Sequence, residues 1–268
     1  MKKILGFLTL VLTSFLVACG TTGNANEDVV TVRLGVTASD ITHWEHVRTQ
    51  LLNDNINLEI IQFTDWVTPN TALAFGDIDL NSFQTHTFLE NFNEENNENL
   101  SIIGETIIMP MGIYSVNHIS LDTVPYGATF SIPNDPTNGA RGLLLLQTVG
   151  LIEVDDAAGY VPLLSDITHN PLNLNIIELE AQQLPRAIQD VDFAVINAII
   201  ALEAGIHPNY DALVLEPLGV ASPFNNVIAA RGEDANDPVL LAVVAAFQTE
   251  DVAKIIAEVF DNTQFPVW

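Results

Sequence analysis

The chain is poor in cysteine and in positive charge. Its 268 residues contain one cysteine, Cys19, and eight lysines and arginines against 34 aspartates and glutamates, a net charge of −26. With one cysteine the chain cannot form an internal disulfide, so its stability must come from packing. So few basic residues cannot neutralise a phosphate backbone, which excludes nucleic acid as a partner.

Recognisable catalytic motifs are also lacking. The sequence has no Gly-x-Ser-x-Gly elbow, Walker loop, Gly-x-Gly-x-x-Gly fingerprint or His-Glu-x-x-His pair, and its carboxylates are too numerous to single out a catalytic couple. We therefore expect neither an enzyme nor a cofactor. His43 and His46 are three residues apart, which leaves a metal-binding alternative together with His86, but no clustered further ligand supports it.

The N-terminus reads as an export signal. Lys2 and Lys3 precede an apolar run over 4–17, and the small-residue site 16–19 ends in Cys19. This pattern resembles the lipobox of bacterial lipoproteins, in which the cysteine receives a diacylglyceryl group and becomes the mature N-terminus; two acyl chains are enough for stable anchoring. We expect a signal peptide over 1–18, a lipidated flexible tether over 19–29, and a location on the extracytoplasmic face of a cell membrane.

The mature chain is long and apolar enough for a sizeable core. Cleavage leaves 250 residues, and 48% of the full chain is hydrophobic, which excludes wholesale disorder. Two of the eight basic residues are lost with the leader, so 34 acidic residues remain against six basic ones, a net charge of −28. We interpret this acidity as a means of staying soluble in a saline or alkaline exterior.

Strand-like and helix-like segments alternate after the tether. Apolar periodicity predicts strands over 30–36, 58–63, 78–80, 100–109, 128–132, 175–179, 193–196 and 226–229. It predicts helices over 40–52, 69–75, 85–92, 139–149, 185–189 and 238–260. The alternation predicts an α/β fold with parallel sheets covered by helices, whose ligands bind beyond the carboxyl ends of the strands.

Four segments occupy that position. They are 63–70, 81–86, 132–141 and 194–197, the last echoed by 222–226. In the third, Asn138 lies in a helix start and Arg141 follows one turn later, a combination suited to a carboxylate. From the residues alone, Arg141 could equally pair with a surface acid, Trp66 and Phe83 could be plain core, and Asn197 could cap a turn.

Taken together, these segments resemble the methionine-binding lipoprotein family, the solute-binding components of methionine-type ABC importers. The resemblance covers about 30–268. Its most specific part is 132–138 followed by 141–152, and further matches are 65–73, 76–84, 178–186 and 194–197. It implies a type II periplasmic-binding-protein fold, with two α/β lobes joined by crossover strands that form a hinge near 109–114 and 216–225. We expect lobe I over 30–111 and 226–268, and lobe II over 112–225.

The resemblance also implies the ligand contacts. Arg141 matches an arginine that grips the ligand carboxylate, and Asn197 and Asn226 match asparagines that hold its amino and carboxylate groups. Trp66 and Phe83 match aromatic positions around the ligand side chain, and Tyr114 matches a tyrosine at the crossover. The predicted ligand-binding residues are Trp66, Phe83, Gln84, Thr85, His86, Tyr114, Asn138, Arg141, Asn197 and Asn226.

One departure from the family pattern concerns position 85. Methionine-specific relatives often read Phe-Gln-His, whereas here Thr85 follows Phe83 and Gln84, and His86 is displaced by one residue. One residue rotates a helical side chain by about 100°, so we expect Thr85 rather than His86 to face the ligand. The predicted function is capture of an amino acid, methionine or a close analogue, by a monomer that docks on an ABC permease with its ATPase subunit. The alternatives are a methionine-containing dipeptide, another hydrophobic amino acid, or, in a different class, the metal-binding lipoprotein.

Overall fold

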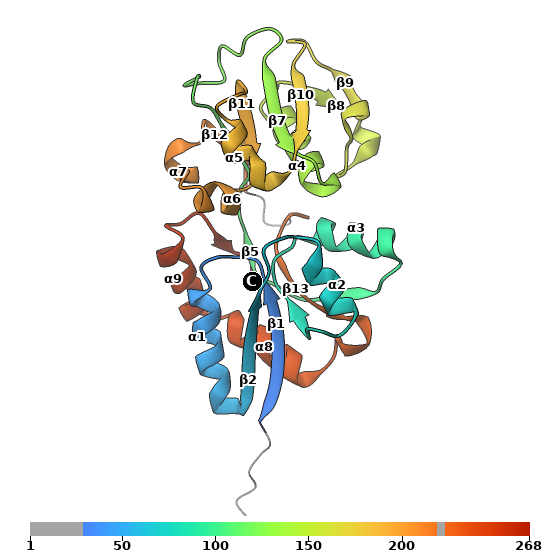
Figure 1. Ribbon diagram of the computed structural model, residues 1–268, viewed down its shortest axis with the longest axis vertical. Helices are drawn as coiled ribbons and strands as arrows, with labels where there is room; N and C mark the ends of the chain where they lie inside the picture. Colours follow the sequence, from blue (N-terminus) through green and yellow to red (C-terminus); the bar gives the residue numbers. More distant parts are fainter. Residues whose placement is uncertain (1–28, 219–222) are drawn as a thin grey trace, which may run out of the picture.

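Two five-stranded sheets, each flanked by helices, form the computed structural model, which describes residues 29–218 and 223–268 (Figure 1). The predicted signal peptide and Cys19 lie outside the described residues. The first sheet has the order β2 (Ile56–Gln62), β1 (Val30–Val36), β3 (Leu80–Asn81), β13 (Val227–Arg231), β4 (Leu100–Glu105). The second has the order β10 (Asn175–Leu179), β7 (Thr129–Pro133), β11 (Phe193–Ile196), β6 (Gly112–Tyr114), β12 (Val214–Leu215).

The two sheets have the same internal plan. In the first, β1 pairs in parallel with β2 and β3, and β13 runs antiparallel to β3 and β4. In the second, β7 pairs in parallel with β10 and β11, and β6 runs antiparallel to β11 and β12. Each sheet thus contains one strand that reaches it after the chain has crossed from the other. We call the first sheet and its helices lobe I, and the second sheet and its helices lobe II.

Helices accompany both sheets. Lobe I carries α1 (Thr42–Leu51), α2 (Thr68–Ala74), α3 (His86–Asn96), α8 (Pro238–Phe247) and α9 (Glu250–Val259). Lobe II carries α4 (Pro136–Thr148), α5 (Leu184–Ala187), α6 (Ala198–Glu203) and α7 (Pro208–Asp211). Short 3₁₀ turns cover Leu52–Asp54, Asp156–Ala158, Leu164–Asp166, Ala181–Gln183 and Gly232–Asp234. None of the helices in the described ranges is long and apolar enough to cross a bilayer.

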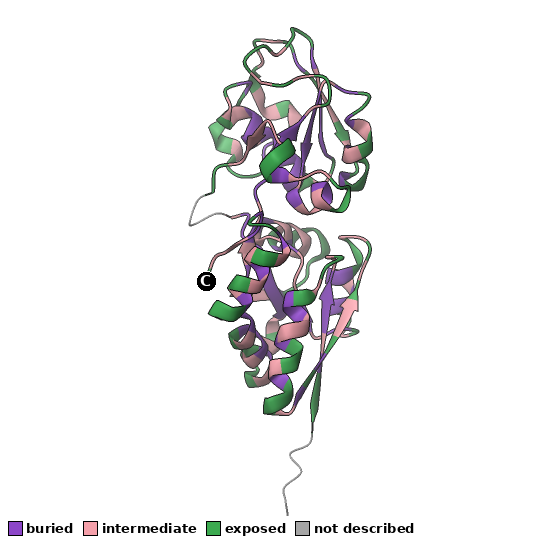
Figure 2. Cartoon of the chain, turned by 90° about the vertical axis from the view of Figure 1, so that its left-hand side faces the viewer, coloured by how far each residue is buried: buried purple, intermediate pink, exposed green. Residues whose placement is uncertain are grey.

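Each lobe buries its own core. In lobe I, alternate residues of β1, namely Val32, Leu34 and Val36, pack with α1, α8 and α9 in one apolar cluster, and a second cluster holds α2 residues and Leu89 of α3. Lobe II likewise has clusters of its own. Figure 2 shows the buried colour concentrated in the sheets and the exposed colour on the outer helix faces. A sheet covered on both faces explains the continuous apolar runs of the sequence, and it confirms the predicted α/β class.

Two segments join the lobes. The first leads from β5 (Ile107–Ile108) to β6, and the second leads from β12 to β13. The strand β5 pairs with β14 (Phe265–Pro266) near the end of the chain, and a further small ladder joins β8 (Glu153–Val154) to β9 (Ile167–His169) in lobe II. The predicted crossovers at 109–114 and 216–225 overlap these joining segments. The lobe boundaries at 111 and 226 stay a prediction.

Some predicted elements differ from the structure. The single helix expected over 238–260 is two helices, because Thr249 caps α9 by accepting a hydrogen bond from the backbone N–H of Val252 at 3.3 Å. The long strand expected over 100–109 is interrupted at Thr106 between β4 and β5. Helix α4 begins at Pro136, three residues before the predicted start, because Asp135 is its N-cap. The shorter elements β8, β9, β12, β14, α6 and α7 were not predicted, and β6 lies within the crossover predicted near 109–114.

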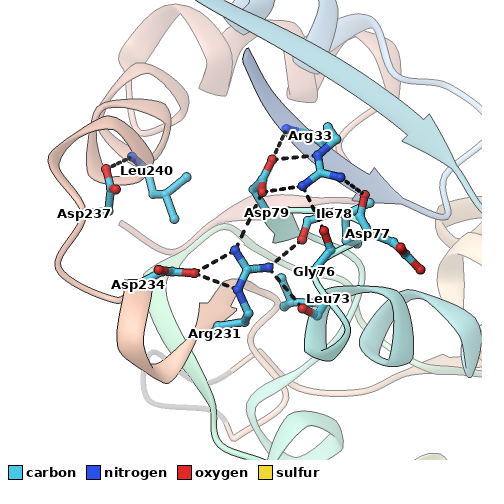
Figure 3. Close-up of polar contacts among 10 residues, drawn as sticks. All are labelled: Arg33, Leu73, Gly76, Asp77, Ile78, Asp79, Arg231, Asp234, Asp237 and Leu240. Atoms are coloured by element: carbon cyan, nitrogen blue, oxygen red, sulfur yellow. Dashed lines mark hydrogen bonds and ion pairs between the residues drawn. The ribbon is translucent and has the colours of Figure 1, made fainter. Parts of the chain in front are cut away.

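A partly buried ion-pair network fastens the strands of lobe I (Figure 3). Arg33 on β1 contacts both carboxylate oxygens of Asp79, at 3.0 Å from Nε and 2.8 Å from Nη2. Arg231 on β13 lies 3.7 Å from the same carboxylate and 2.7 Å from Asp234. Both guanidinium groups also donate to backbone carbonyls, those of Leu73, Gly76, Asp77 and Ile78. The network therefore joins β1 and β13 through the residue that precedes β3.

This network generates a pH-dependent prediction. Burial by itself raises the pKa of the Asp79 carboxyl, but hydrogen bonds from Arg33 and the charges of Arg33 and Arg231 outweigh it and lower that pKa. A lowered pKa in the folded state adds stability above the unfolded value of about 3.9, and this stability is lost as the pH falls through the folded value. Asp79→Asn should lower the free energy of unfolding by about 2–3 kcal/mol at neutral pH, and the difference should shrink below about pH 4.

Denaturant unfolding of both proteins at several pH values measures this difference. Asp77→Asn, in the same turn but with an exposed side chain, is the matched control and should change stability by less than about 0.5 kcal/mol. A difference for Asp79→Asn that is equally large in acid and at neutrality would mean that the carboxylate charge is not what stabilises the network.

Candidate ligand-binding cleft

A cavity of about 450 Å³, which includes its open mouth, lies between the two lobes. It is formed by the segments that follow β2 and β3 in lobe I and β7 and β11 in lobe II, together with residues at the lobe junctions. These are the carboxyl ends of parallel strands, where α/β proteins bind their ligands. The lining residues are Trp66, Phe83, Gln84, Thr85, Phe88, Met109, Asn138, Arg141, Asn197, Ala198, Ile199 and Asn226. Eight of the ten predicted ligand residues are among them, and His86 and Tyr114 are not.

Aromatic rings from lobe I form one wall. Trp66 precedes α2, and Phe83 packs edge-on against Phe88, with ring centroids 5.9 Å apart at an angle of 76°. Sequence reasoning missed Phe88, although it lies three residues after Thr85, a spacing that places two side chains on the same face of a helix. It also missed Met109 and Ile199, which read as ordinary core residues. The wall suits an apolar side chain of a ligand.

Arg141 makes contacts that the sequence did not predict. It is buried, and its Nε lies 3.0 Å from one carboxylate oxygen of Glu216, while Nη2 bonds the same carboxylate and the carbonyl oxygen of Met109 at 2.7 Å. Its guanidinium carbon lies 4.8 Å from the centre of the Phe224 ring. Glu216 also accepts a hydrogen bond from the backbone N–H of Met111 at 3.2 Å. Arg141 therefore fastens both joining segments to α4.

This pairing revises the expected role of the guanidinium. The family resemblance implies that Arg141 grips a ligand carboxylate, but two of its three nitrogens are occupied by Glu216 and a carbonyl. Among the described residues, Nη1 has no hydrogen-bond partner. One guanidinium nitrogen, Nη1, is therefore left for a ligand, instead of a fork of two. The acidic partner lies 75 residues along the chain from Arg141, and nothing in the local sequence singles it out among 34 acidic residues.

A chain of amides lies beside Arg141. Nδ2 of Asn197 donates to Oδ1 of Asn138 at 2.7 Å, and Asn138 donates through its backbone N–H and Nδ2 to Asp135 at 2.9 and 3.0 Å. Oδ1 of Asn197 is buried and has no partner among the described residues. Asn226, from lobe I, lines the cavity opposite and pairs with Thr85 in an isolated β-bridge. The sequence predicted the three asparagines and Thr85 as ligand residues, but it did not predict a role for Asp135.

Gln84 lines the cavity, but its amide is used within lobe I. Its Oε1 accepts from Nδ2 of Asn70 at 2.6 Å, and its Nε2 donates to Asn70 and Asn81 at 2.6 and 2.9 Å. All three side chains are buried. A closed amide triangle leaves Gln84 little capacity for a ligand. We therefore interpret Gln84 as a residue that positions its neighbours Phe83 and Thr85.

Thr85 and His86 point to different places. Thr85 lines the cavity and caps α3 by accepting from the backbone N–H of Phe88 at 3.3 Å. His86 is the first residue of α3, and its Nε2 lies 2.9 Å from a carboxylate oxygen of Glu105. The geometry therefore has the arrangement expected from the register of Phe83 and Gln84. That Thr85 binds a ligand stays a prediction.

Tyr114 does not line the cleft. It lies on β6, is 1% exposed, and belongs to a buried cluster of lobe II with Ala194 and Ile196. Burial raises the pKa of the Tyr114 phenol, and its hydroxyl has no hydrogen-bond partner in the part of the chain that the structure describes. We therefore correct its predicted role: Tyr114 packs in the core beside the joining segment instead of lining the ligand cavity.

The histidines do not converge on a metal site. His43 is buried against the rings of Trp44, Phe247 and Phe260, and burial lowers its pKa to about 4. His46 bonds the side chain of Gln50 on the same helix, whereas His86 bonds Glu105. Within residues 29–218 and 223–268, no group of three or more His, Cys, Asp or Glu side chains could hold a metal ion. The structure therefore gives the metal-binding alternative no support.

The Arg141 contacts generate a prediction about stability. Removing one partner of a buried ion pair leaves the other charge uncompensated, so Arg141→Ala should lower the free energy of unfolding of the ligand-free protein by about 3–5 kcal/mol. Arg141→Ala with Glu216→Ala should cost less than the two single changes added together. Denaturant unfolding measures both. Arg186→Ala, an exposed arginine of the same lobe, is the control, and parent-like stability of Arg141→Ala would contradict the buried pairing.

Comparison with known proteins identifies relatives of the whole mature chain. The model of the NlpA lipoprotein family matches residues 32–268. The D-methionine-binding lipoprotein MetQ of Escherichia coli (strain K12) is 35% identical over 257 residues, which cover 94% of this chain and 93% of that protein. Among solved structures, a nutrient binding protein from Burkholderia cenocepacia bound to methionine is 38% identical, with a TM-score of 0.83 over 88% of this chain and 100% of that chain. The substrate binding protein of a methionine transporter from Streptococcus pneumoniae is 34% identical, with a TM-score of 0.82 over 89% and 96% of the two chains. These likenesses confirm the predicted resemblance and fold, and the chain belongs to the NlpA lipoprotein family.

Proposed function

We propose that the chain captures an amino acid, methionine or a close analogue, between its lobes and delivers it to an ABC importer. The observation that carries this proposal is the lining of the cavity, which places a buried arginine and several amides beside aromatic rings. A free amino acid with an apolar side chain offers the complementary groups. The relatives named above, which are a methionine-binding protein, a methionine-bound protein and a methionine-transport protein, support the same ligand class.

The two ends of such a ligand would meet different chemistry. Trp66, Phe83 and Phe88 would enclose the side chain, and a thioether sulfur makes favourable contacts with aromatic rings. On the opposite side, Nη1 of Arg141 would donate to the carboxylate, and the amide oxygens of the cleft would accept from the ammonium. Among the described residues, Arg141 is the charged side chain that lines the cavity, and Glu216 balances its charge. A zwitterion, which carries no net charge, suits such a site.

Ligand capture would act by closing the lobes. Trp66 of lobe I packs against a buried cluster of lobe II, and Ile199 of α6 packs against buried clusters of both lobes. These contacts exist only while the lobes are together. A ligand that touches both lobes would stabilise this arrangement over an open one by its differential affinity. The closed form would then dock on the permease.

Two alternatives concern the ligand. A second cavity of about 560 Å³, including open space, adjoins the first and shares Trp66, Phe83, Met109, Ile199 and Asn226 with it. This added space would suit a methionine-containing dipeptide or a larger hydrophobic amino acid. The relatives named here are binding proteins, and the cleft supports binding rather than catalysis, so we propose no enzymatic activity.

The membrane anchor and the transport partners are further parts of the proposal. Lipidation of Cys19 would hold the protein on the extracytoplasmic face of the membrane through two acyl chains. Cys19 lies outside the described residues, so this part rests on the sequence pattern and on the lipoprotein family. The monomer would dock on an ABC permease, which is coupled to an ATPase subunit, and release its ligand there.

Titration calorimetry of the mature protein with methionine tests the ligand. Methionine should bind at one site. A methionine-containing dipeptide and leucine, titrated in the same way, test the two alternative ligands, and Zn²⁺ should give no heat beyond dilution.

His86→Ala should change methionine affinity by less than about 0.5 kcal/mol, because its imidazole faces Glu105. Thr85→Val should weaken binding by about 1 kcal/mol through loss of the hydroxyl. Affinity should stay constant between about pH 5.5 and 8, where a histidine in the cleft would titrate.

Thr85→Ser controls for the helix cap, because serine keeps both the hydroxyl and the capping oxygen. It should bind methionine like the parent. If the parent binds none of the amino acids, the proposed function is wrong. If His86→Ala abolishes binding while Thr85→Val does not, the helix start must shift register to bring the imidazole into the cleft.

Replacement of the lipidated residue tests the location. Cys19→Ser should appear in the soluble or secreted fraction instead of the membrane pellet, because acylation is the anchor that the sequence predicts. Fractionation followed by immunoblotting measures the distribution. Methionine binding by the released protein should equal that of the parent, since the predicted tether precedes β1, the first strand of lobe I. Retention in membranes washed at alkaline pH would contradict the anchor.

A further inference from the structure

A hydrogen-bonded chain of three side chains leads from a charged group into the cleft. The carboxylate of Asp135 accepts from the backbone N–H and from Nδ2 of Asn138, at 2.9 and 3.0 Å. Oδ1 of Asn138 then accepts from Nδ2 of Asn197 at 2.7 Å. Asn138 and Asn197 line the cavity, whereas Asp135 does not. We call this chain the amide relay.

The charged end of the relay sets the direction of every bond in it. An ionised carboxylate can only accept hydrogen bonds, whereas an amide has one donating and one accepting end. Asn138 must therefore turn its NH₂ group toward Asp135, which leaves its oxygen to face Asn197. Asn197 must therefore donate to that oxygen through its own NH₂ group. The one group of the relay without a partner among the described residues is Oδ1 of Asn197, and it is buried.

That oxygen is not used in the ordinary way. Asn197 is the N-cap residue of α6, where an asparagine oxygen commonly accepts from a backbone N–H of the first turn, but here the side chain makes no such bond. A buried acceptor without a donor costs about 1–3 kcal/mol. The relay therefore holds Asn197 in a conformation that is unfavourable until a donor arrives in the cleft.

We infer that Asp135 is a positioning residue which, through Asn138, presents Oδ1 of Asn197 as the acceptor for the ammonium group of the bound amino acid. The inference rests on the proposed function and deepens it. Asn197 recognises the amino end of the ligand, while Arg141 recognises the carboxylate end. The relay makes the cleft specific for α-amino acids over the corresponding carboxylic acids that lack the amino group.

Two substitutions at the ends of the relay test this direction. Asp135→Ser keeps a good N-cap for α4, but its hydroxyl can donate as well as accept, so Asn138 is free to turn over. Asn197→Asp places an obligate acceptor opposite Oδ1 of Asn138, which Asp135 holds in place. In the combined variant Asn138 can reverse, accept from the serine hydroxyl and donate to the new carboxylate. Every group of the reversed relay is then satisfied.

Calorimetry with methionine should show that Asp135→Ser has opposite effects on affinity in two backgrounds: it should weaken binding by the parent and strengthen binding by Asn197→Asp. Asp135→Ser alone should weaken binding by about two- to fivefold, because Asn197 then populates both amide orientations. Asn197→Asp alone should weaken it at least about tenfold, since two acceptors face each other. Adding Asp135→Ser to Asn197→Asp should strengthen binding to within about threefold of the parent. The des-amino analogue 4-(methylthio)butanoate should bind the combined variant at least about tenfold more weakly than it binds the parent, because a carboxylate replaces the amide oxygen.

Two controls separate the relay from simpler causes. Repulsion between two carboxylates would also make Asp135→Ser helpful beside Asn197→Asp, but it does not need Asn138. We therefore add Asn138→Ala to the parent, to each single variant and to the combined variant. In this background the effects of Asp135→Ser and Asn197→Asp on methionine affinity should be independent. Asp237→Ser removes another N-cap aspartate that precedes a proline, at the start of α8 in lobe I (Figure 3). It should leave methionine affinity within about twofold of the parent, and the denaturant unfolding of each variant verifies that it is folded.

The outcomes are distinguishable. A parent protein that binds no amino acid overturns the proposed function and this inference together. If the parent binds methionine but the two substitutions act independently, or if their coupling survives Asn138→Ala, the relay does not orient Asn197 and the inference alone is overturned. Unchanged binding of 4-(methylthio)butanoate by the combined variant would place Asn197 away from the ammonium, which overturns it as well.

Discussion

A buried ion pair at the junction of the lobes, between Arg141 and Glu216, is the contact on which the rest of the site depends. Arg141 projects from the second turn of α4, and Glu216 follows β12 at the start of the second joining segment. The same two side chains bond Met109 and Met111 in the first joining segment. Because breaking such a pair is costly, the lobe closure that we propose would have to leave it intact. Arg141 therefore belongs both to the junction of the lobes and to the lining of the cleft.

The scarcity of cations makes the use of each arginine informative. Arg33 and Arg231 hold Asp79 where β3 begins, and Arg141 holds Glu216 where the lobes meet. In all three cases the guanidinium also donates to backbone carbonyls, which a lysine ammonium does with poorer geometry. Of the residues that the structure describes, those that line the cavity include no acidic side chain. The strong negative charge of the chain thus stays outside the cleft, and the pairing of Arg141 keeps the cleft nearly neutral.

The range of each interaction decides how far the sequence predicts it. Local spacing was enough to place Thr85 in the cavity and His86 outside it, because Phe83 and Gln84 fix the register of the helix start. The capping role of Thr249 is equally local, although apolar periodicity alone predicts one helix over 238–260. The sequence does not identify Glu216, because 33 other acidic side chains compete with it and its partner Arg141 is distant in the chain. The predicted ligand contact of Tyr114 has another difficulty. Strand β6 is buried on both faces, so its apolar run does not reveal which face is turned toward the cleft.

In the proposed function, the different chemistry of the two lobes would give the cleft its selectivity. The aromatic rings come from lobe I, whereas Arg141 and the amide relay come from lobe II. A purely apolar molecule would contact the rings of lobe I but leave Oδ1 of Asn197 buried without a donor. A small polar zwitterion would bond the polar groups of lobe II but leave the rings of lobe I without a ligand contact. In the proposed function, a ligand with both ends would gain more free energy from the closed arrangement than from the open one, and that difference would shift the equilibrium between them. Recognition of the ligand and closure of the lobes would then be coupled through the same contacts.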